Sequence, residues 1–312
     1  MVYGHEKGSQ ITAKRTSLIA TYTGGFAHLR FAMCQSGMLQ SLERQSGLPL
    51  AFDPLAGVLT WPGERIRGGE ASERSADEMR DYRAEAEAQP SSGVVYRVWR
   101  HIAHIGDEEK LRVARLRYDI TIIRAGAFIG ERREYFRTAG HYHSEKPGTG
   151  LTYPEVYEVL FGRVYWLIQR PERGNPAALE EIYVIEAGPG EKAVIPPGFG
   201  HLTVNAFAEP CVVANVSFDG LTNEYELFRQ HRGGGYWIVE GPTKDTIAFE
   251  PNPGYLRIPG LSKLRPREVP ELGLLRSMPL YTLLRDPEKL RFLIQPEEFT
   301  PLLALKRCYK LL

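Results

Sequence analysis

The sequence predicts an all-β protein, a jelly-roll barrel with extensions at both ends. First, short stretches rich in Val, Ile, Tyr and Phe recur between residues 94 and 218, and turns containing Gly and Pro separate them. Second, apolar and polar residues alternate over 116–122, which is typical of a strand with one face in a core and the other in a solvated cavity. Roughly eight or nine such strands at close spacing favour a sandwich or jelly-roll barrel.

The chain of 312 residues is long enough for one or two domains. We expect residues 1–45 to be disordered or to lie outside the fold, because they show no sustained apolar periodicity. Residues 46–240 are predicted to form the barrel domain with its lead-in. Residues 241–312, in which proline recurs, are predicted to form a C-terminal extension packed on the barrel.

Short helices are predicted in both extensions. Over residues 75–87, apolar residues recur every three or four positions among charges, and Ser75 can cap the first turn. Asp286 as N-cap and Pro287 at the first helical position predict a second helix near the end of the chain.

Between these helices the pattern predicts strands and turns. A strand near 134–143 is expected to carry a pair of histidines. The stretch 144–153 contains Pro and Gly and is predicted to be a loop, either one that shapes a pocket mouth or a tolerated surface insertion. The apolar stretches 156–161 and 164–169 flank Gly-Arg and predict a β-hairpin.

The composition excludes several classes of partner. With 39 basic and 38 acidic residues, bulk charge supports neither a nucleic acid nor a membrane surface as partner. No apolar run approaches the roughly 20 residues of a membrane span, and the N-terminus lacks the layout of a signal peptide. The three cysteines are far apart, so we expect no disulfide framework, no cysteine-based metal site and a cytoplasmic location.

A candidate metal site lies in the middle of the chain. His141 and His143 are two residues apart, so on a strand both side chains lie on one face. Glu155 and His201 complete a set of three imidazoles and one carboxylate, which suits Fe²⁺, Mn²⁺, Ni²⁺ or Zn²⁺ with positions left open. A single strand histidine is more often an ordinary core or surface residue, but these spacings favour ligands. Glu145 is an alternative carboxylate, since it would share the face of His143 if the strand continued.

These residues fall within two motifs that resemble those of the cupin β-barrels. The second motif, G-x5-P-x-G-x2-H-x3-N, is met at every position from Gly190 to Asn205. The first, G-x5-H-x-H-x3/4-E-x6-G, is met by the two histidines, Glu155 and Gly162. It departs in lacking the first glycine and in having eleven residues before the glutamate. The resemblance implies the cupin double-stranded β-helix.

Within the cupins, the chain resembles the archaeal-type glucose-6-phosphate isomerases. The shared patterns are T-x-G-H-x-H at 138–143, E-V-Y-x-x-L-x-G at 155–162 and P-P-x-x-x-H-x-T-V-N at 196–205, and the resemblance covers roughly 75–240. It implies an aldose–ketose isomerase of glycolysis and gluconeogenesis that interconverts glucose 6-phosphate and fructose 6-phosphate. It also implies a homodimer and one divalent metal ion, for which Fe²⁺ is the first choice and Mn²⁺, Ni²⁺ and Zn²⁺ are alternatives.

The resemblance also implies roles for particular residues. Glu155 is our choice as the base that takes the C2 proton, and Tyr157 lines the site beside it. The implied metal ligands are His141, His143, Glu155 and His201. The positions that match those holding the sugar phosphate are Thr121, Thr138, Gly140 and Tyr225.

Two departures from the family pattern concern the pocket. The spacing between the paired histidines and the glutamate is longer than in the family, and this insertion leaves the form of the pocket mouth open. A histidine expected two residues before the site tyrosine is Asn223. Arg137 could supply compensating charge, or it could be a solvated strand residue.

Other functions fit the same ligands. Another metal-dependent cupin enzyme, a dioxygenase or a mannose-6-phosphate isomerase, is one alternative. A non-catalytic sugar-binding cupin that keeps its metal site is the other.

Overall fold

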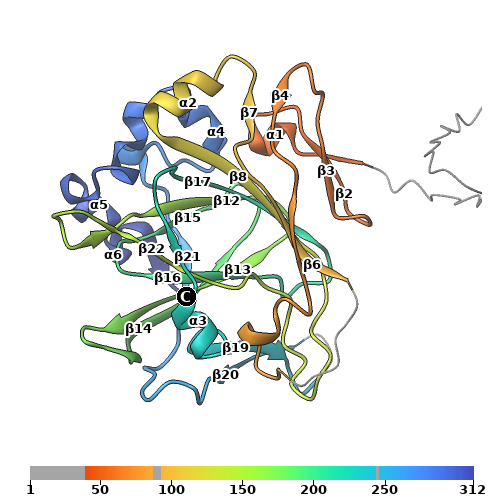
Figure 1. Cartoon of the computed structure of the whole chain (residues 1–312), viewed down its shortest axis with the longest axis vertical. Helices are drawn as coiled ribbons and strands as arrows, with labels where there is room; N and C mark the ends of the chain where they lie inside the picture. The colour runs from red at the N-terminus through yellow and green to blue at the C-terminus, as the bar shows by residue number, and fades with distance from the viewer. Residues whose placement is uncertain (1–38, 87–92, 244–245) are drawn as a thin grey trace, which may run out of the picture. The chain divides into compact units, whose positions relative to one another are not determined.

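The computed structural model describes residues 39–86, 93–243 and 246–312 of the chain. Two larger β-sheets form the body of the fold, and smaller sheets and short helices surround them (Figure 1). The predicted all-β jelly roll, with extensions that carry short helices, is confirmed.

The first sheet has six strands, and its inner strands are rich in Val and Ile, whose branched side chains pack well on a pleated surface. All its neighbouring strands are antiparallel. In hydrogen-bonded order the strands are β15 (Lys192–Ile195), β12 (Glu155–Phe161), β17 (Cys211–Phe218), β8 (Leu116–Ile123), β6 (Val94–Trp99) and β5 (Ser72–Ser75).

The second sheet has five strands, and the C-terminal segment contributes two of them. One of these two runs parallel to its neighbour and the other antiparallel. In hydrogen-bonded order the strands are β16 (Gly200–Val204), β13 (Val164–Glu172), β14 (Asn175–Ala187), β21 (Ser262–Pro266) and β22 (Tyr309–Leu311).

The remaining strands form small sheets, and the helices are short. One small sheet has three strands in the order β1 (Gln40–Ser41), β2 (Ala51–Asp53) and β3 (Val58–Thr60). The others pair β4 (Ile66–Arg67) with β7 (Ala103–His104), β9 (Tyr142–His143) with β18 (Asn223–Glu224), β10 (Glu145–Lys146) with β11 (Leu151–Thr152), and β19 (Tyr236–Glu240) with β20 (Ile247–Pro251). The α-helices are α1 (Glu43–Ser46), α2 (Glu108–Ala114), α3 (Glu226–Gln230), α4 (Leu280–Leu283), α5 (Thr300–Leu303) and α6 (Leu305–Cys308). The 3₁₀ helices are η1 (Arg80–Tyr82), η2 (Pro270–Leu272), η3 (Pro287–Leu293) and η4 (Pro296–Glu298).

Successive strands cross between the two sheets, which is the connectivity of a jelly roll. β12, β15 and β17 belong to the first sheet, whereas β13, β14 and β16 belong to the second. Side chains from the two sheets meet between them: the rings of Tyr157 on β12 and Trp166 on β13 lie 5.5 Å apart. The core therefore lies between the sheets, and polar residues on the inner strand faces at one end can share a pocket.

The predicted hairpin at Gly162-Arg163 is wrong. β12 pairs with β15 and β17, and β13 pairs with β14 and β16, so the two strands lie in different sheets. Gly162 has a φ of 72°, and a Cβ there would lie 2.7 Å from the carbonyl oxygen of Pro210. The glycine therefore permits a corner between sheets rather than a hairpin turn.

The predicted helix over 75–87 shrinks to a single turn. Ser75 and Glu78 form a capping box, because each side chain accepts the backbone N–H of the other residue, at 3.2 and 2.8 Å. The chain then leaves the helical path, because the N–H of Ala84 bonds to the carboxylate of Glu134 at 2.9 Å. Tertiary contacts outweigh local propensity here.

The expected strand over 134–143 is regular only at its end, in β9. Before β9 it makes isolated bridges, among them Arg137 with Val204 and His141 with His201. The loop predicted at 144–153 contains the small hairpin of β10 and β11.

The two ends of the chain stand as follows. Residues 1–38 of the predicted N-terminal segment lie outside the described residues, while 39–45 include β1 and the start of α1. The helix predicted from Pro287 begins there, as the 3₁₀ helix η3. The domain boundaries drawn from the sequence stay predictions.

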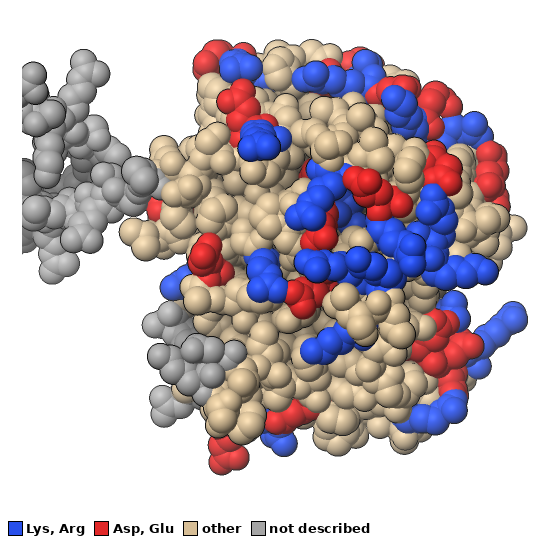
Figure 2. Space-filling view, turned by 180° about the vertical axis from the view of Figure 1, so that it is seen from behind, with Lys and Arg blue, Asp and Glu red and all other residues tan. Residues whose placement is uncertain are grey.

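Charges of both signs are interspersed on the surface. On the face seen in Figure 2, Lys and Arg side chains gather together, and Asp and Glu side chains lie beside them. Within the three described stretches of chain, no helix has both the length and the apolar character needed to cross a membrane.

A buried ion pair fastens the C-terminal extension to the first sheet. Lys192 Nζ lies 2.7 Å from Glu158 Oε1, and both side chains are almost fully buried. The second carboxylate oxygen of Glu158 accepts the N–H of Leu280 at 2.7 Å, and Lys192 donates to the carbonyl of Leu275 at 2.8 Å. Every charge in the pair therefore has a partner, which burial requires.

Replacing one member of this pair should leave the other charge buried alone. We expect E158Q and K192M each to lower the free energy of unfolding by about 3–5 kcal/mol, and the double variant E158L/K192M to recover much of that loss. Denaturant unfolding of the three variants measures this. Single variants that lose less than about 1 kcal/mol would contradict it.

Candidate metal centre and substrate pocket

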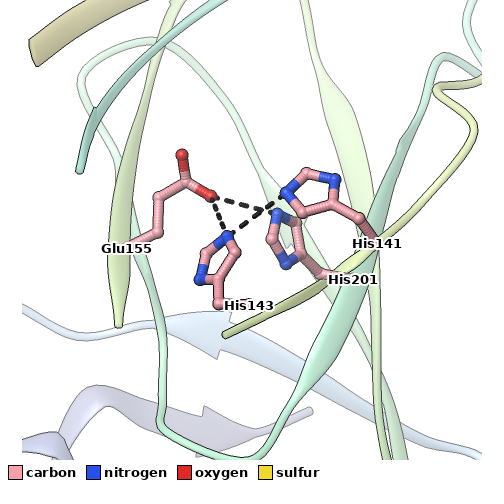
Figure 3. Close-up of side chains that lie close together, drawn as sticks. All are labelled: His141, His143, Glu155 and His201. Atoms are coloured by element: carbon pink, nitrogen blue, oxygen red, sulfur yellow. Dashed lines mark hydrogen bonds and ion pairs between the residues drawn. The ribbon is translucent and has the colours of Figure 1, made fainter. Parts of the chain in front are cut away.

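The four side chains expected to be ligands meet at one point (Figure 3). His143 lies on β9 and His141 just before it, Glu155 begins β12 in the first sheet, and His201 lies on β16 in the second. His141 and His201 exchange two backbone hydrogen bonds of 3.1 and 3.0 Å. A fixed backbone contact therefore holds ligands from different elements side by side.

The donor atoms have the spacing that a metal ion requires. The Nε2 atoms of His141 and His143 are 3.2 Å apart, and Oε2 of Glu155 lies 3.3 Å from His143 Nε2. The same oxygen lies 3.1 Å from His201 Nε2, and all four donor atoms lie within 4.8 Å of one another. Metal–ligand bonds of about 2.0–2.2 Å place neighbouring donors about 3.0–3.5 Å apart. The set can hold a divalent cation.

The protonation states also suit a metal. Burial, together with the neighbouring His201 and His143, holds the pKa of His141 well below its usual value, and burial lowers the pKa of His201. Burial alone would raise the pKa of Glu155, but its contacts with His143 and His201 outweigh burial and hold that pKa well below its usual value. Neutral imidazoles and an ionised carboxylate are the forms that bind metal.

Neighbouring groups orient two of the ligands. His143 Nδ1 lies 2.7 Å from the carbonyl oxygen of Tyr153, so its ring donates there and presents the Nε2 lone pair to the centre. Asn215 on β17 donates its side-chain N–H to Oε1 of Glu155 at 2.7 Å. The other oxygen, Oε2, is buried and receives no hydrogen bond among the described residues, which leaves it available to a metal.

The inserted stretch 144–153 contributes to this support. Its last residue, Tyr153, supplies the carbonyl that orients His143. Thr152 accepts the N–H of Gly198 at 2.7 Å, which ties the insertion to the turn before β16. None of the residues 144–153, all of which the structure describes, lines the pocket. The insertion therefore lies behind the ligands rather than at the mouth of the pocket.

The two candidate carboxylates differ clearly in position. Glu145 is exposed, and its carboxylate accepts the N–H of Gly150 at 3.1 Å within the hairpin. Glu155 lies in the cluster. The structure thus brings together the four residues His141, His143, Glu155 and His201 and leaves Glu145 outside.

A pocket opens beside the ligands, on the inner face of the first sheet. The residues that the resemblance assigns to the sugar phosphate and to catalysis all line it. Gly140 has a φ of 83°, and a Cβ there would lie 2.9 Å from the ring of Phe228, so only glycine suits this place before His141. The residues concerned are Thr121, Thr138, Gly140, Glu155, Tyr157 and Tyr225.

Two tyrosine hydroxyls and an amide are among the polar groups that line the pocket. The hydroxyl of Tyr157 lies 2.9 Å from His201 Nε2. Burial, and next the charge of Glu155, hold the pKa of Tyr157 well above its usual value, so it remains a hydroxyl donor. Asn223, which stands where a histidine was expected, lines the pocket and donates to the hydroxyl of Tyr225 at 3.3 Å.

Arg137 fits neither role considered for it. Its side chain is buried, its Nε donates to Glu134 at 2.6 Å, and it also bonds to the carbonyl oxygens of Thr138 and Tyr82. It is therefore not a solvated strand residue, and it is not among the described residues that line the pocket.

The sequence interpretation missed several polar lining residues, among them Arg100, Arg117, Asp119, Thr203 and Asn215. Asp119 and Arg117 lie on β8, two and four residues before Thr121, and the alternation noted over 116–122 placed them on the same strand face. Arg100 follows β6, and Asn215 pairs with Asp119 across β8 and β17. The periodicity revealed the polar face of β8, but nothing in the sequence showed which residues of other strands lie beside it.

Three imidazoles and one carboxylate between the sheets of a jelly roll define a cupin with a candidate metal centre. Within that class, the chain belongs to the glucose-6-phosphate isomerase family: the family model described as Glucose-6-phosphate isomerase (GPI) matches residues 72–252. The glucose-6-phosphate isomerase of Thermococcus gammatolerans is 30% identical over 189 residues, which are 57% of this chain and 89% of the relative. That of Thermococcus litoralis is 31% identical over 152 residues, 47% of this chain and 69% of the relative. The family expected from the motifs is confirmed.

Solved structures that are similar to part of the chain include an oxalate oxidase in complex with glycolate, with a TM-score of 0.30 and 16% identity over 44% of this chain and 59% of that chain. The oxalate decarboxylase of Bacillus subtilis has a TM-score of 0.29 and 16% identity over 44% of this chain and 30% of that chain. The assignment of the fold depends on the strand order described above.

Replacing Glu155 and Glu145 in turn shows which of the two carboxylates binds the metal. We expect the wild-type protein to retain a divalent metal through gel filtration and E155Q to lose it, because the charged ligand is gone. The matched variant E145Q should retain it. Metal content measured by mass spectrometry decides the matter, and metal loss in E145Q alone would assign the ligand to Glu145.

The side-chain amide of Asn215 should affect metal affinity, because it orients the carboxylate of Glu155. We expect N215A to weaken metal affinity about 10- to 100-fold, because the carboxylate loses the partner that orients it. Titration against a competing chelator measures the affinity. N252A, which removes a buried asparagine elsewhere, should lower stability with no change in metal affinity. An N215A affinity equal to that of the wild-type protein would show that this orientation is unimportant.

Proposed function

We propose that the protein is a metal-dependent glucose-6-phosphate isomerase that interconverts glucose 6-phosphate and fructose 6-phosphate. The observation that carries the proposal is the ligand cluster of three imidazoles and Glu155 at the edge of a polar pocket. Membership of the glucose-6-phosphate isomerase family supports it.

The reaction moves one hydrogen between C1 and C2 of an open-chain sugar phosphate. A divalent metal held by His141, His143, Glu155 and His201 would supply a Lewis acid for the carbonyl and the neighbouring hydroxyl oxygen. Of the candidate metals, Fe²⁺ is our first choice, and Mn²⁺, Ni²⁺ and Zn²⁺ share the ligand preference.

Glu155 is the proposed base. It takes the proton from C2 of the aldose, the C2–H electron pair forms the C1–C2 double bond, and the carbonyl π electrons move to O1, which gains a proton to give a cis-enediol. The C2 hydroxyl then loses its proton as the C2 carbonyl forms, and Glu155 returns to C1 a proton that can exchange with solvent in between. Asn215 keeps the carboxylate oriented through its hydrogen bond. The hydroxyl of Tyr157 donates towards the reacting oxygens, because it lies at the ligand cluster and stays protonated.

The remainder of the pocket binds the substrate. The hydroxyls of Thr121 and Thr138, the N–H of Gly140 and the hydroxyl of Tyr225 are proposed donors to the sugar phosphate. We further propose a homodimer located in the cytoplasm, as in the family that the motifs resemble.

The test begins with protein stripped by a chelator and reloaded with Fe²⁺, Mn²⁺, Ni²⁺ or Zn²⁺ in turn. Formation of glucose 6-phosphate from fructose 6-phosphate is followed in a coupled assay. We expect metal-dependent turnover that falls to the level of the stripped protein in H141A and H201A, because each removes a ligand. H231A, which replaces a histidine stacked on Tyr255 away from the site, is the matched control and should stay active.

Absence of turnover with every metal, despite stoichiometric metal binding, would exclude the isomerase. Running the reaction in D₂O tests the base: deuterium in the product supports proton transfer through Glu155, whereas its absence supports a direct hydride shift.

A further inference from the structure

The pocket contains positive charge that the proposed mechanism does not use. Strands β6 and β8 are neighbours in the first sheet (Figure 1). Arg117 lies on β8 and Arg100 directly follows β6, and both line the pocket together with His141 and Glu155. Among the described residues, no other Lys or Arg lines this pocket.

Arg117 is a largely buried cation with unused hydrogen-bond donors. Its side chain is 15% exposed. Its Nε lies 3.0 Å from Asp119 Oδ2, and one terminal nitrogen lies 3.9 Å from Asp219 Oδ1, but within the described stretches the buried Nε has no hydrogen bond. A guanidinium has five N–H donors, and leaving buried donors unmade is unfavourable. Asp119 therefore pairs with Nε, and the terminal nitrogens, for which the described residues offer no hydrogen bond, remain for a further acceptor.

The neighbours of Arg117 hold it at the pocket. Asp119, which pairs with it, is buried and accepts the backbone N–H of His101 at 3.0 Å. His101, the residue that donates this N–H, has a φ of 56°, a backbone conformation that non-glycine residues rarely adopt. The carboxylate is thus held in place, and its ion pair with Nε keeps the guanidinium beside the pocket.

A phosphate group calls for such a cation. At neutral pH it carries close to two negative charges, while Thr121, Thr138 and Gly140 offer only neutral donors. Arg137 is buried in its pair with Glu134, and Asn223 carries no charge. Arg117 and Arg100 are the cations that remain.

We propose that Arg117, with Arg100 beside it, binds the phosphate of the sugar phosphate and selects phosphorylated over neutral sugars. A guanidinium can make two parallel N–H···O bonds to a phosphate, which matches the donors left free here. Asp119 is the positioning residue that aims it. The inference rests on the proposed function, since it assigns the binding of that substrate.

The test is a calorimetric titration of the metal-loaded protein with D-glucitol 6-phosphate, an open-chain compound without a carbonyl that cannot be isomerised. We expect R117Q to weaken this binding, and that of inorganic phosphate, about 10- to 100-fold. R112Q, which replaces an exposed arginine on α2, is the matched control and should bind as the wild-type protein does. In the isomerase assay, KM for fructose 6-phosphate should rise by a similar factor with little change in kcat, because phosphate is bound equally in the ground and transition states.

R117K keeps the charge beside Asp119 but lacks the planar fork, so an intermediate loss is expected. If R117Q does not fold, the R117K affinity decides. The inference is overturned if R117Q, or R117K where R117Q does not fold, binds D-glucitol 6-phosphate as tightly as the wild-type protein. It is also overturned if the wild-type protein binds no D-glucitol 6-phosphate. A fall in kcat with unchanged affinity also overturns it. If the wild-type protein binds this ligand through Arg117 but turns over no sugar phosphate, only the isomerase proposal is contradicted.

Discussion

The candidate metal centre depends on the backbone contact between His141 and His201. The two residues exchange hydrogen bonds in both directions, and this contact joins the segment before β9 to β16 of the second sheet. Glu155 reaches the same point from the first sheet. Because each ligand is tied to a hydrogen-bonded backbone, little conformational freedom remains to be lost when a metal binds. The ligand geometry is therefore a property of the fold rather than of mobile side chains.

Local sequence patterns correctly predicted features that depend on a single strand or a single turn. The two-residue spacing of His141 and His143 predicted a shared direction, and the structure has it even though only β9 is regular. The hairpin at Gly162 failed because a glycine with positive φ also permits a corner between sheets, and local sequence does not say which partner a strand will find. The capping box at Ser75 formed, but a distant carboxylate, Glu134, ended the helix.

In the site, too, local sequence predicted some residues, and strand pairing decided the others. Glu155, which keeps the motif spacing to Gly162 that Glu145 lacks, is the carboxylate found in the cluster, because this spacing belongs to the strand that carries it. Arg137 was considered for the pocket because it is adjacent to Thr138, yet neighbours on a strand point to opposite faces, and it pairs with Glu134 instead. Arg117 was overlooked, since its place beside the ligands comes from the pairing of β8 with β17 and of β17 with β12, which no local pattern encodes.

Strand β12 links the site to the rest of the chain through its two faces. Glu155 and Tyr157 face the pocket, whereas Glu158 points the other way, into the ion pair with Lys192 and the hydrogen bond from Leu280. Successive side chains point to opposite faces of a strand, so a displacement of β12 moves the side chains on both faces. The C-terminal extension is therefore coupled to the position of the ligand Glu155 without touching the pocket. A loss of the extension would disturb the geometry of the ligand cluster as well as stability, because the charge of Glu158 would then lose a partner on the strand that carries the ligand.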